Sequence, residues 1–86
     1  MKPAGRIQLL AEFGVRVREA RIRQRLSQEE LADLAGVHRT YMGPVERGDR
    51  NPALVNIVRI SDALDIDPSA LVKGLSTRAQ RGRAGR

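Results

Sequence analysis

Few side chains in this 86-residue sequence are suited to covalent chemistry. The sequence contains one histidine and no cysteine, and it shows neither a clustered pair of carboxylates nor a glycine-rich loop that would bind phosphate. The lone histidine, His38, has no second metal ligand close by, so we expect it in a surface or capping role. We predict that the protein is not an enzyme and holds neither a metal ion nor a cofactor. No small-molecule ligand is indicated.

The polar side chains best placed for binding lie at positions 38–41, directly after the expected end of a helix. If a new helix begins near His38 or Arg39, its first turn exposes Arg39, Thr40 and Tyr41. An α-helix fits the major groove of double-stranded DNA, where arginine can donate two hydrogen bonds to guanine and threonine can contact the thymine methyl group. We predict base contacts from Arg39, Thr40 and Tyr41, and a phosphate contact from His38.

Each of the three predicted base-contacting residues also has a purely structural interpretation. Arg39 is then an ordinary solvated side chain, Thr40 supports the start of the helix, and Tyr41 packs over the edge of the domain. Position favours DNA contact for Arg39 and leaves the two interpretations open for Thr40 and Tyr41.

Two flanking segments are suited to DNA phosphates. Ser27-Gln28 begins the preceding helix, and the free N–H groups at the start of a helix bind anions. Arg47, Arg50 and Asn51 lie just beyond the second helix, where a loop can hold the DNA backbone. We predict phosphate contacts from these five residues.

The charge of the chain also favours a polyanionic partner. Sixteen Lys and Arg residues against ten Asp and Glu residues give a net charge of +6. Residues 1–74 carry twelve basic and ten acidic residues, a net of +2, and the remaining four arginines lie at positions 75–86 without any acidic residue. A positive net charge favours nucleic acid as the partner, with an anionic membrane as the second choice.

The apolar pattern predicts an all-α domain of five helices. Residues 7–24 show three- and four-residue apolar steps, Ser27 to Glu30 forms a capping box, and Gly36 ends that helix. A third helix is expected from about residue 38 to residue 47 or 48, and a fourth from Pro52 to about residue 64, with Leu54, Ile57, Val58, Ser61 and Leu64 buried. A fifth begins at Asp67-Pro68 and ends at Gly74.

The ends of the chain are expected to lie outside the domain of residues 7–75. Residues 1–6 are predicted to be a flexible start, and the Arg/Gly-rich residues 76–86 a disordered basic tail. No apolar run reaches the ~20 residues that span a bilayer, and no apolar stretch of signal-peptide length follows Lys2. We therefore expect a cytoplasmic protein without a membrane partner, associated with the nucleoid when bound to DNA.

Several motifs together resemble the Cro/repressor-type helix-turn-helix family, also called the XRE family. The resemblance covers roughly residues 13–75 and implies a compact lambda-repressor-like domain that binds operator DNA as a dimer. The motifs are Leu26-Ser27-Gln28-Glu29-Glu30-Leu31-Ala32, Ala35-Gly36-Val37, Tyr41-Met42, Val45-Glu46-Arg47-Gly48 and Asn51-Pro52-Ala53-Leu54.

The resemblance implies roles for individual residues. It implies phosphate contacts from Ser27, Gln28 and the loop around Arg50-Asn51, and base contacts from Arg39 and Thr40 with Tyr41 close by. It also implies a buried ion pair between Arg21 and Glu46 that fixes the recognition helix to the scaffold.

The sequence departs from the family pattern at three places. Arg25 replaces a common glycine, so we expect a less sharply turned helix end there. Ala53 replaces the usual capping residue of the fourth helix, so we assign the cap to Asn51. Gly43-Pro44 interrupts the third helix, because proline lacks the N–H that would bond to the Thr40 carbonyl. We therefore expect a kink or a displaced second half.

The leading hypothesis is a sequence-specific regulator of transcription that acts as a homodimer on a pseudo-palindromic operator. Its role is open between a phage-type repressor, the controller of a restriction–modification system and an antitoxin. The alternative is a protein-interaction module with weak DNA reading, which Pro44 motivates. Candidate dimer-surface residues are Ile66, Leu71, Val72 and Leu75.

Overall fold

The computed structural model describes residues 3–78, with side chains from Gly5 onward. This part of the chain is all-α, as predicted, and contains no strand. Its five helices are α1 (Pro3–Arg23), α2 (Gln28–Ala35), α3 (Met42–Arg47), α4 (Leu54–Ala63) and α5 (Ser69–Val72). The predicted tail falls largely on residues 79–86, which lie outside the described part.

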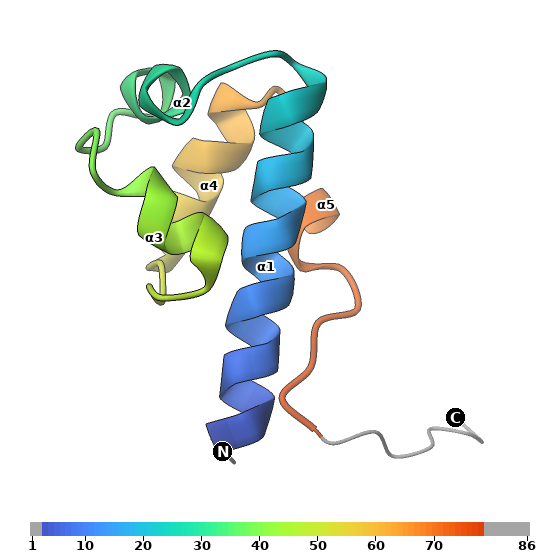
Figure 1. Ribbon diagram of the computed structural model, residues 1–86. Helices are drawn as coiled ribbons and strands as arrows, with labels where there is room; N and C mark the ends of the chain where they lie inside the picture. The colour runs from blue at the N-terminus through green and yellow to red at the C-terminus, as the bar shows by residue number, and fades with distance from the viewer. Residues whose placement is uncertain (1–2, 79–86) are drawn as a thin grey trace.

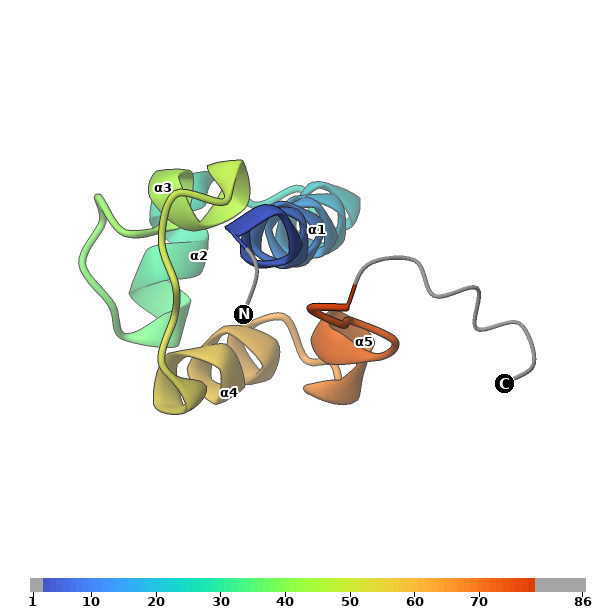
Figure 2. The ribbon, with the colours of Figure 1, turned by 90° about the horizontal axis from the view of Figure 1, so that it is seen from below.

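The long helix α1 is the axis of the molecule (Figure 1). It packs against α3 on one side and α5 on the other, while α2 packs against α3 and α4. Seen from below, α1 and α3 lie in one row and α4 and α5 in a second (Figure 2). The core between them is almost entirely aliphatic; its fully buried larger side chains are Val17, Leu31, Met42, Val45, Ile60, Leu64 and Leu71.

Helix α1 differs from the prediction at both ends. It begins at Pro3, four residues earlier than expected, so residues 3–6 are helical rather than an irregular start. At its other end Arg25 adopts a left-handed conformation with φ 58°, and the Leu26 N–H donates to the Arg21 carbonyl. The expectation of a less sharply turned end was wrong, because the arginine accepts the conformation that a glycine would adopt more readily.

Gly14 allows α1 and α3 to approach each other closely. A Cβ atom at this position would lie 2.5 Å from the carbonyl oxygen of Glu46 and 2.6 Å from that of Val45. Only a residue without a side chain fits against these two backbone groups. Gly14 therefore contributes to packing as well as weakening the helix locally.

Helix α2 begins and ends as predicted. The Ser27 hydroxyl accepts from the Glu30 N–H, the Glu30 side chain accepts from the Ser27 N–H, and Gly36 ends the helix with φ 74°. Local side-chain chemistry is sufficient for both boundaries.

Helix α4 begins later than predicted, and Asn51 is not its cap. The N-cap is Ala53, which makes no side-chain hydrogen bond, and Pro52 is buried in the preceding loop. Ser61 and Leu64 are buried as expected and Ile57 is half-buried, but Leu54 is 74% exposed and Val58 is 38% exposed. Leu54 lies at the exposed start of α4, so the apolar stripe against the core begins one turn later, at Ile57. The packed face of α4 includes Ile60 in place of Val58.

Helix α5 is held at both ends. The Ser69 N–H donates to Asp67 Oδ1 over 2.8 Å, and this hydrogen bond lowers the pKa of Asp67. Arg16 of α1 donates to the carbonyl oxygens of Leu71 and Lys73 at the other end.

No helix among residues 3–78 is long and apolar enough to cross a membrane.

Candidate nucleic-acid interface

The polar residues at positions 38–41 lie in a turn before α3, not in its first turn. The expected helix start at residue 38 or 39 was wrong, because α3 begins at Met42. In a helix starting near Arg39, Pro44 would leave the Thr40 carbonyl without its partner. With the start at Met42, Pro44 is the third helical residue, where no intrahelical N–H bond is required. The helix therefore begins late instead of kinking.

Hydrogen bonds within the turn give it a defined shape. The Tyr41 N–H donates to the His38 carbonyl over 3.0 Å, and the Thr40 N–H donates to His38 Nδ1 over 3.1 Å. The Thr40 hydroxyl also lies 2.8 Å from His38 Nδ1. These hydrogen bonds show that the His38 side chain caps the turn and that Thr40 supports it. Both residues are exposed.

Arg39 is exposed on the turn and bound to α2 through one hydrogen bond. Its side chain is 67% exposed, and its Nη2 donates to Glu29 Oε2 of α2 over 2.6 Å. From the sequence, Glu29 is simply one of the residues at the start of α2. No sequence signal connects two residues that lie ten positions apart on different elements.

Tyr41 is packed rather than free. Its ring is half-buried against the core, its hydroxyl accepts from Asn56 Nδ2 of α4 over 3.2 Å, and the Arg50 guanidinium lies 5.2 Å from its ring centroid. This arrangement favours the packing interpretation of Tyr41. It also brings Arg50, from the loop after α3, next to the turn. Asn56 lies fifteen positions beyond Tyr41, and no motif in the sequence connects the two residues.

The start of α2 lies beside α3. Ser27 uses its hydroxyl in the capping box, and the Gln28 side-chain amide donates to Glu46 Oε1 over 3.0 Å. Gln28 as a whole is exposed at the helix start. The first backbone N–H groups of α2 have no partner within the helix, so an anion can bind there.

The ion pair between Arg21 and Glu46 joins the scaffold to α3. Arg21 Nε and Nη2 donate to the two carboxylate oxygens over 2.6 and 2.9 Å, and Nη1 donates to the Leu26 carbonyl over 2.8 Å. The side chains are only 13% and 3% exposed. The hydrogen bonds with Glu46 raise the pKa of Arg21 above its ordinary value. The Glu46 carboxylate of α3 therefore accepts hydrogen bonds from Arg21 of α1 and from Gln28 of α2, and so connects the three helices.

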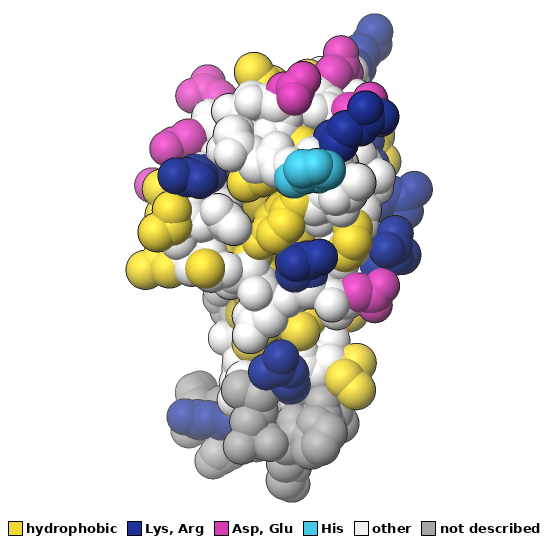
Figure 3. Space-filling model, turned by 90° about the vertical axis from the view of Figure 1, so that its left-hand side faces the viewer, with side chains coloured by type: hydrophobic (Ala, Val, Ile, Leu, Met, Phe, Trp, Pro, Cys, Tyr) yellow, Lys and Arg dark blue, Asp and Glu magenta, His cyan; other side chains and the backbone are white. Residues whose placement is uncertain are grey.

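The remaining predicted phosphate contacts are Arg47, which is the last residue of α3, and Arg50 and Asn51 in the loop that follows it. Arg47 is exposed and pairs with Asp49 over 3.1 Å, and Arg50 and Asn51 are exposed. Figure 3 shows the side of the molecule with α2 and α3, where Lys and Arg side chains surround the single histidine and most acidic side chains gather toward α2. Within residues 3–78, no group of three or more potential ligands could hold a metal ion.

Comparison with known proteins agrees with this arrangement. The helix-turn-helix family (HTH_3) matches residues 17–71. The control protein C.BamHI of Bacillus amyloliquefaciens is 46% identical over 61 residues, which are 70% of this chain and 75% of that protein.

Two solved structures are similar over nearly the whole of their own chains. The restriction-modification controller protein C.AhdI of Aeromonas hydrophila is 55% identical with a TM-score of 0.71, covering 72% of this chain and 94% of that one. The P22 c2 repressor, solved with a synthetic operator, is 31% identical with a TM-score of 0.67, covering 72% and 94%. The chain therefore belongs to the XRE-type helix-turn-helix family of transcriptional regulators.

Proposed function

We propose that this regulator binds double-stranded DNA sequence-specifically, as a homodimer on a pseudo-palindromic operator. The observation that carries the proposal is the turn of residues 38–41 between α2 and α3, in which His38, Arg39 and Thr40 are exposed. The exposed Arg47 and Arg50 follow it, at the end of α3 and in the next loop. The buried pair of Arg21 and Glu46 gives this surface a rigid support.

Arg39 and Thr40 are proposed to contact bases, because both are exposed on the turn. Tyr41 is proposed to line the edge of that contact, since its ring is held by Arg50 and Asn56. Phosphate contacts are assigned to residues on either side of the turn and within it: Ser27, Gln28, His38, Arg47, Arg50 and Asn51.

The proposed dimer surface is the exposed apolar face of α4 and α5. Leu54, Val55, Val58 and Val72 are between 38% and 74% exposed. Of the surface residues expected from the sequence, Leu71 is only 1% exposed, and Ile66 and Leu75 are partly buried against the core. A dimer surface at Leu71 was therefore wrong, since that side chain is part of the core.

Among the three possible roles, we propose that the chain controls a restriction–modification system. The support is its identity of 46% to a control protein and 55% to a restriction-modification controller protein, against 36% to the immunity repressor of Bacillus phage phi105. The action is expected to take place in the cytoplasm, on the nucleoid.

Selection of bound duplexes from a random pool tests the proposal. The expected result is one enriched sequence with two half-sites about 10 base pairs apart and two chains bound per duplex. If no sequence is enriched and a protein partner binds tightly instead, the chain is an interaction module. Pro44 no longer motivates that alternative, because it lies in the first turn of α3, where a proline is tolerated.

A further inference from the structure

We infer that Glu29 positions Arg39 for base recognition and thereby increases the discrimination between DNA sequences. The inference rests on the proposed function, because it concerns how the turn of residues 38–41 reads a base. It adds a residue of α2 that contacts Arg39 without being assigned any contact of its own with DNA.

The contact leaves most of the Arg39 guanidinium available. Glu29 Oε2 accepts a single hydrogen bond, from Nη2, over 2.6 Å. A guanidinium has five N–H donors in a planar fork, and guanine recognition needs two of them. Among the described residues, Glu29 is the sole hydrogen-bond partner of the Arg39 side chain. Arg39 can therefore keep Glu29 and present a second edge to a base.

Holding Arg39 in place affects cognate and random DNA differently. A free arginine side chain populates many rotamers, and ordering them on binding weakens affinity. The ion pair with Glu29 orders part of the Arg39 side chain before DNA binds, so less conformational entropy is lost on binding. This increases affinity only for DNA in which Arg39 meets a matching base. The carboxylate also offsets the charge of Arg39, and this weakens its attraction to phosphates in any sequence. Both effects raise the ratio of specific to non-specific affinity.

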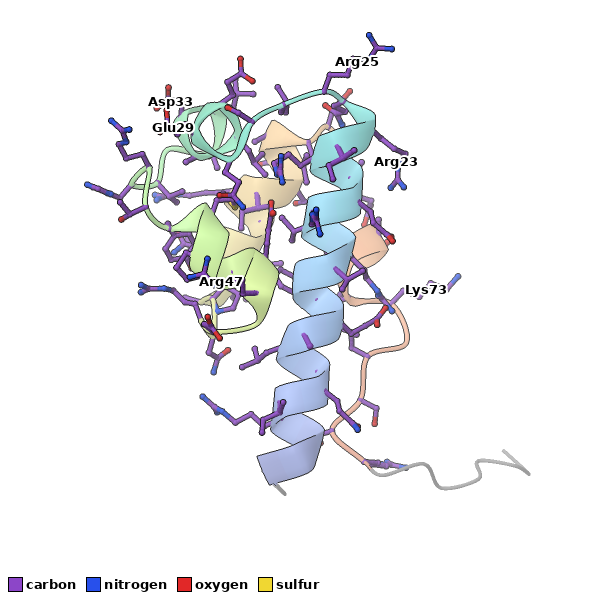
Figure 4. The ribbon with its side chains drawn as sticks, in the orientation of Figure 1. Arg23, Arg25, Glu29, Asp33, Arg47 and Lys73 are labelled. Carbon is purple, nitrogen blue, oxygen red and sulfur yellow. The ribbon has the colours of Figure 1, made fainter. Side chains whose placement is uncertain are left out.

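Glu29 is not needed for the fold. Its side chain is 62% exposed, and exposed ion pairs contribute little to stability. The capping box at the start of α2 uses Glu30, not Glu29. Figure 4 shows Glu29 and Asp33 on the outward side of α2, so Asp33 offers a matched carboxylate on the same helix. Asp33 is exposed and takes part in no ion pair within residues 3–78.

The test compares Glu29→Gln, Arg39→Ala, the double variant and Asp33→Asn. The probes are the duplex selected by the wild-type chain and its single base-pair variants. Arg39→Ala should lose about 5- to 150-fold of discrimination at one base pair. Glu29→Gln should lose about two- to fivefold at the same base pair and nothing further in the Arg39→Ala background. Asp33→Asn should leave the discrimination unchanged.

Glu29→Asp separates positioning from charge. It keeps the negative charge and shortens the side chain, so positioning predicts the same loss as Glu29→Gln. Unchanged discrimination in both Glu29 variants, or equal changes in Glu29→Gln and Asp33→Asn on every duplex, would overturn the inference. If the wild-type chain selects no duplex at all, the result contradicts the proposed function itself, and not only the role of Glu29. Unchanged melting temperatures for the Glu29 variants distinguish lost positioning from lost folding.

Discussion

At the scale of single residues, the carboxylate of Glu46 joins three helices. It accepts two hydrogen bonds from Arg21 of α1 and one from Gln28 of α2, and it belongs to α3. Because its side chain is only 3% exposed, these donors replace the water that the carboxylate would otherwise bind. The position of α3 therefore depends on a charge that must remain paired.

Arg21→Ala should lower the free energy of unfolding by about 3–5 kcal/mol, because it leaves Glu46 buried without its counter-charge. The measurement is urea unfolding followed by circular dichroism. Arg23→Ala is the matched control, since Arg23 is exposed on the same helix (Figure 4). Equal effects of the two substitutions would show that the pair does not support the fold.

Arg25→Gly should stabilise the protein. Arg25 is exposed and left-handed, with φ 58°, a conformation that costs a residue with a side chain about 1–2 kcal/mol. Glycine removes that cost but loses more conformational entropy on folding, so we expect a net gain of about 0.5–1 kcal/mol. Thermal unfolding of Arg25→Gly and Arg25→Ala decides the point, because alanine keeps the strain and should give no gain.

At the scale of elements, the close approach of α1 and α3 places the surface that contains the turn. Gly14 makes that approach possible, as the short distances from its Cβ position to the Val45 and Glu46 carbonyls show. A side chain there would displace α3, together with the turn that precedes it and the loop that follows it.

Gly14→Ala should destabilise the protein by about 3 kcal/mol, although alanine favours a helix by about 1 kcal/mol. The opposing backbone cannot move without separating the helices. Gly43→Ala is the control, because the atoms nearest to its Cβ belong to the ends of the Arg47 and Gln28 side chains, which can shift. A stabilised Gly14→Ala variant would contradict the packing described for α1 and α3.

How much of these elements could be predicted depends on how local their causes are. Both ends of α2 follow from nearby side chains, the Ser27–Glu30 box and Gly36, and were predicted. The late start of α3 depends on Pro44, which has no N–H to donate to the carbonyl four residues before it. The late start of α4 depends on the packing of the preceding loop, in which Pro52 is buried. The pair of Arg39 and Glu29 exists only once the turn has folded back toward α2.

At the scale of the whole molecule, one apolar face remains uncovered. α4 and α5 form one row of the structure (Figure 2), and α4 alone exposes Leu54, Val55 and Val58. Two copies joined through this face would each retain the turn of residues 38–41 for one half-site.

Leu54→Glu should convert the dimer to a 9.5 kDa monomer, because a charge in the interface would lose its water without gaining a partner. Sedimentation equilibrium measures the mass. Leu34→Glu is the control, since Leu34 is 61% exposed and belongs to α2, which is not part of the proposed surface. A wild-type chain that is already monomeric at micromolar concentration and on its operator would contradict the proposed dimer.

The central claim is sequence-specific DNA binding through a surface that neutralises phosphates. It is tested most directly by the salt dependence of affinity for the selected duplex and for a scrambled duplex of equal length. If about 6–10 phosphates are contacted, affinity should fall by about 10³- to 10⁵-fold between about 50 and 200 mM salt, with the selected duplex bound more tightly throughout. A flat titration, or equal affinity for the two duplexes, would contradict the claim.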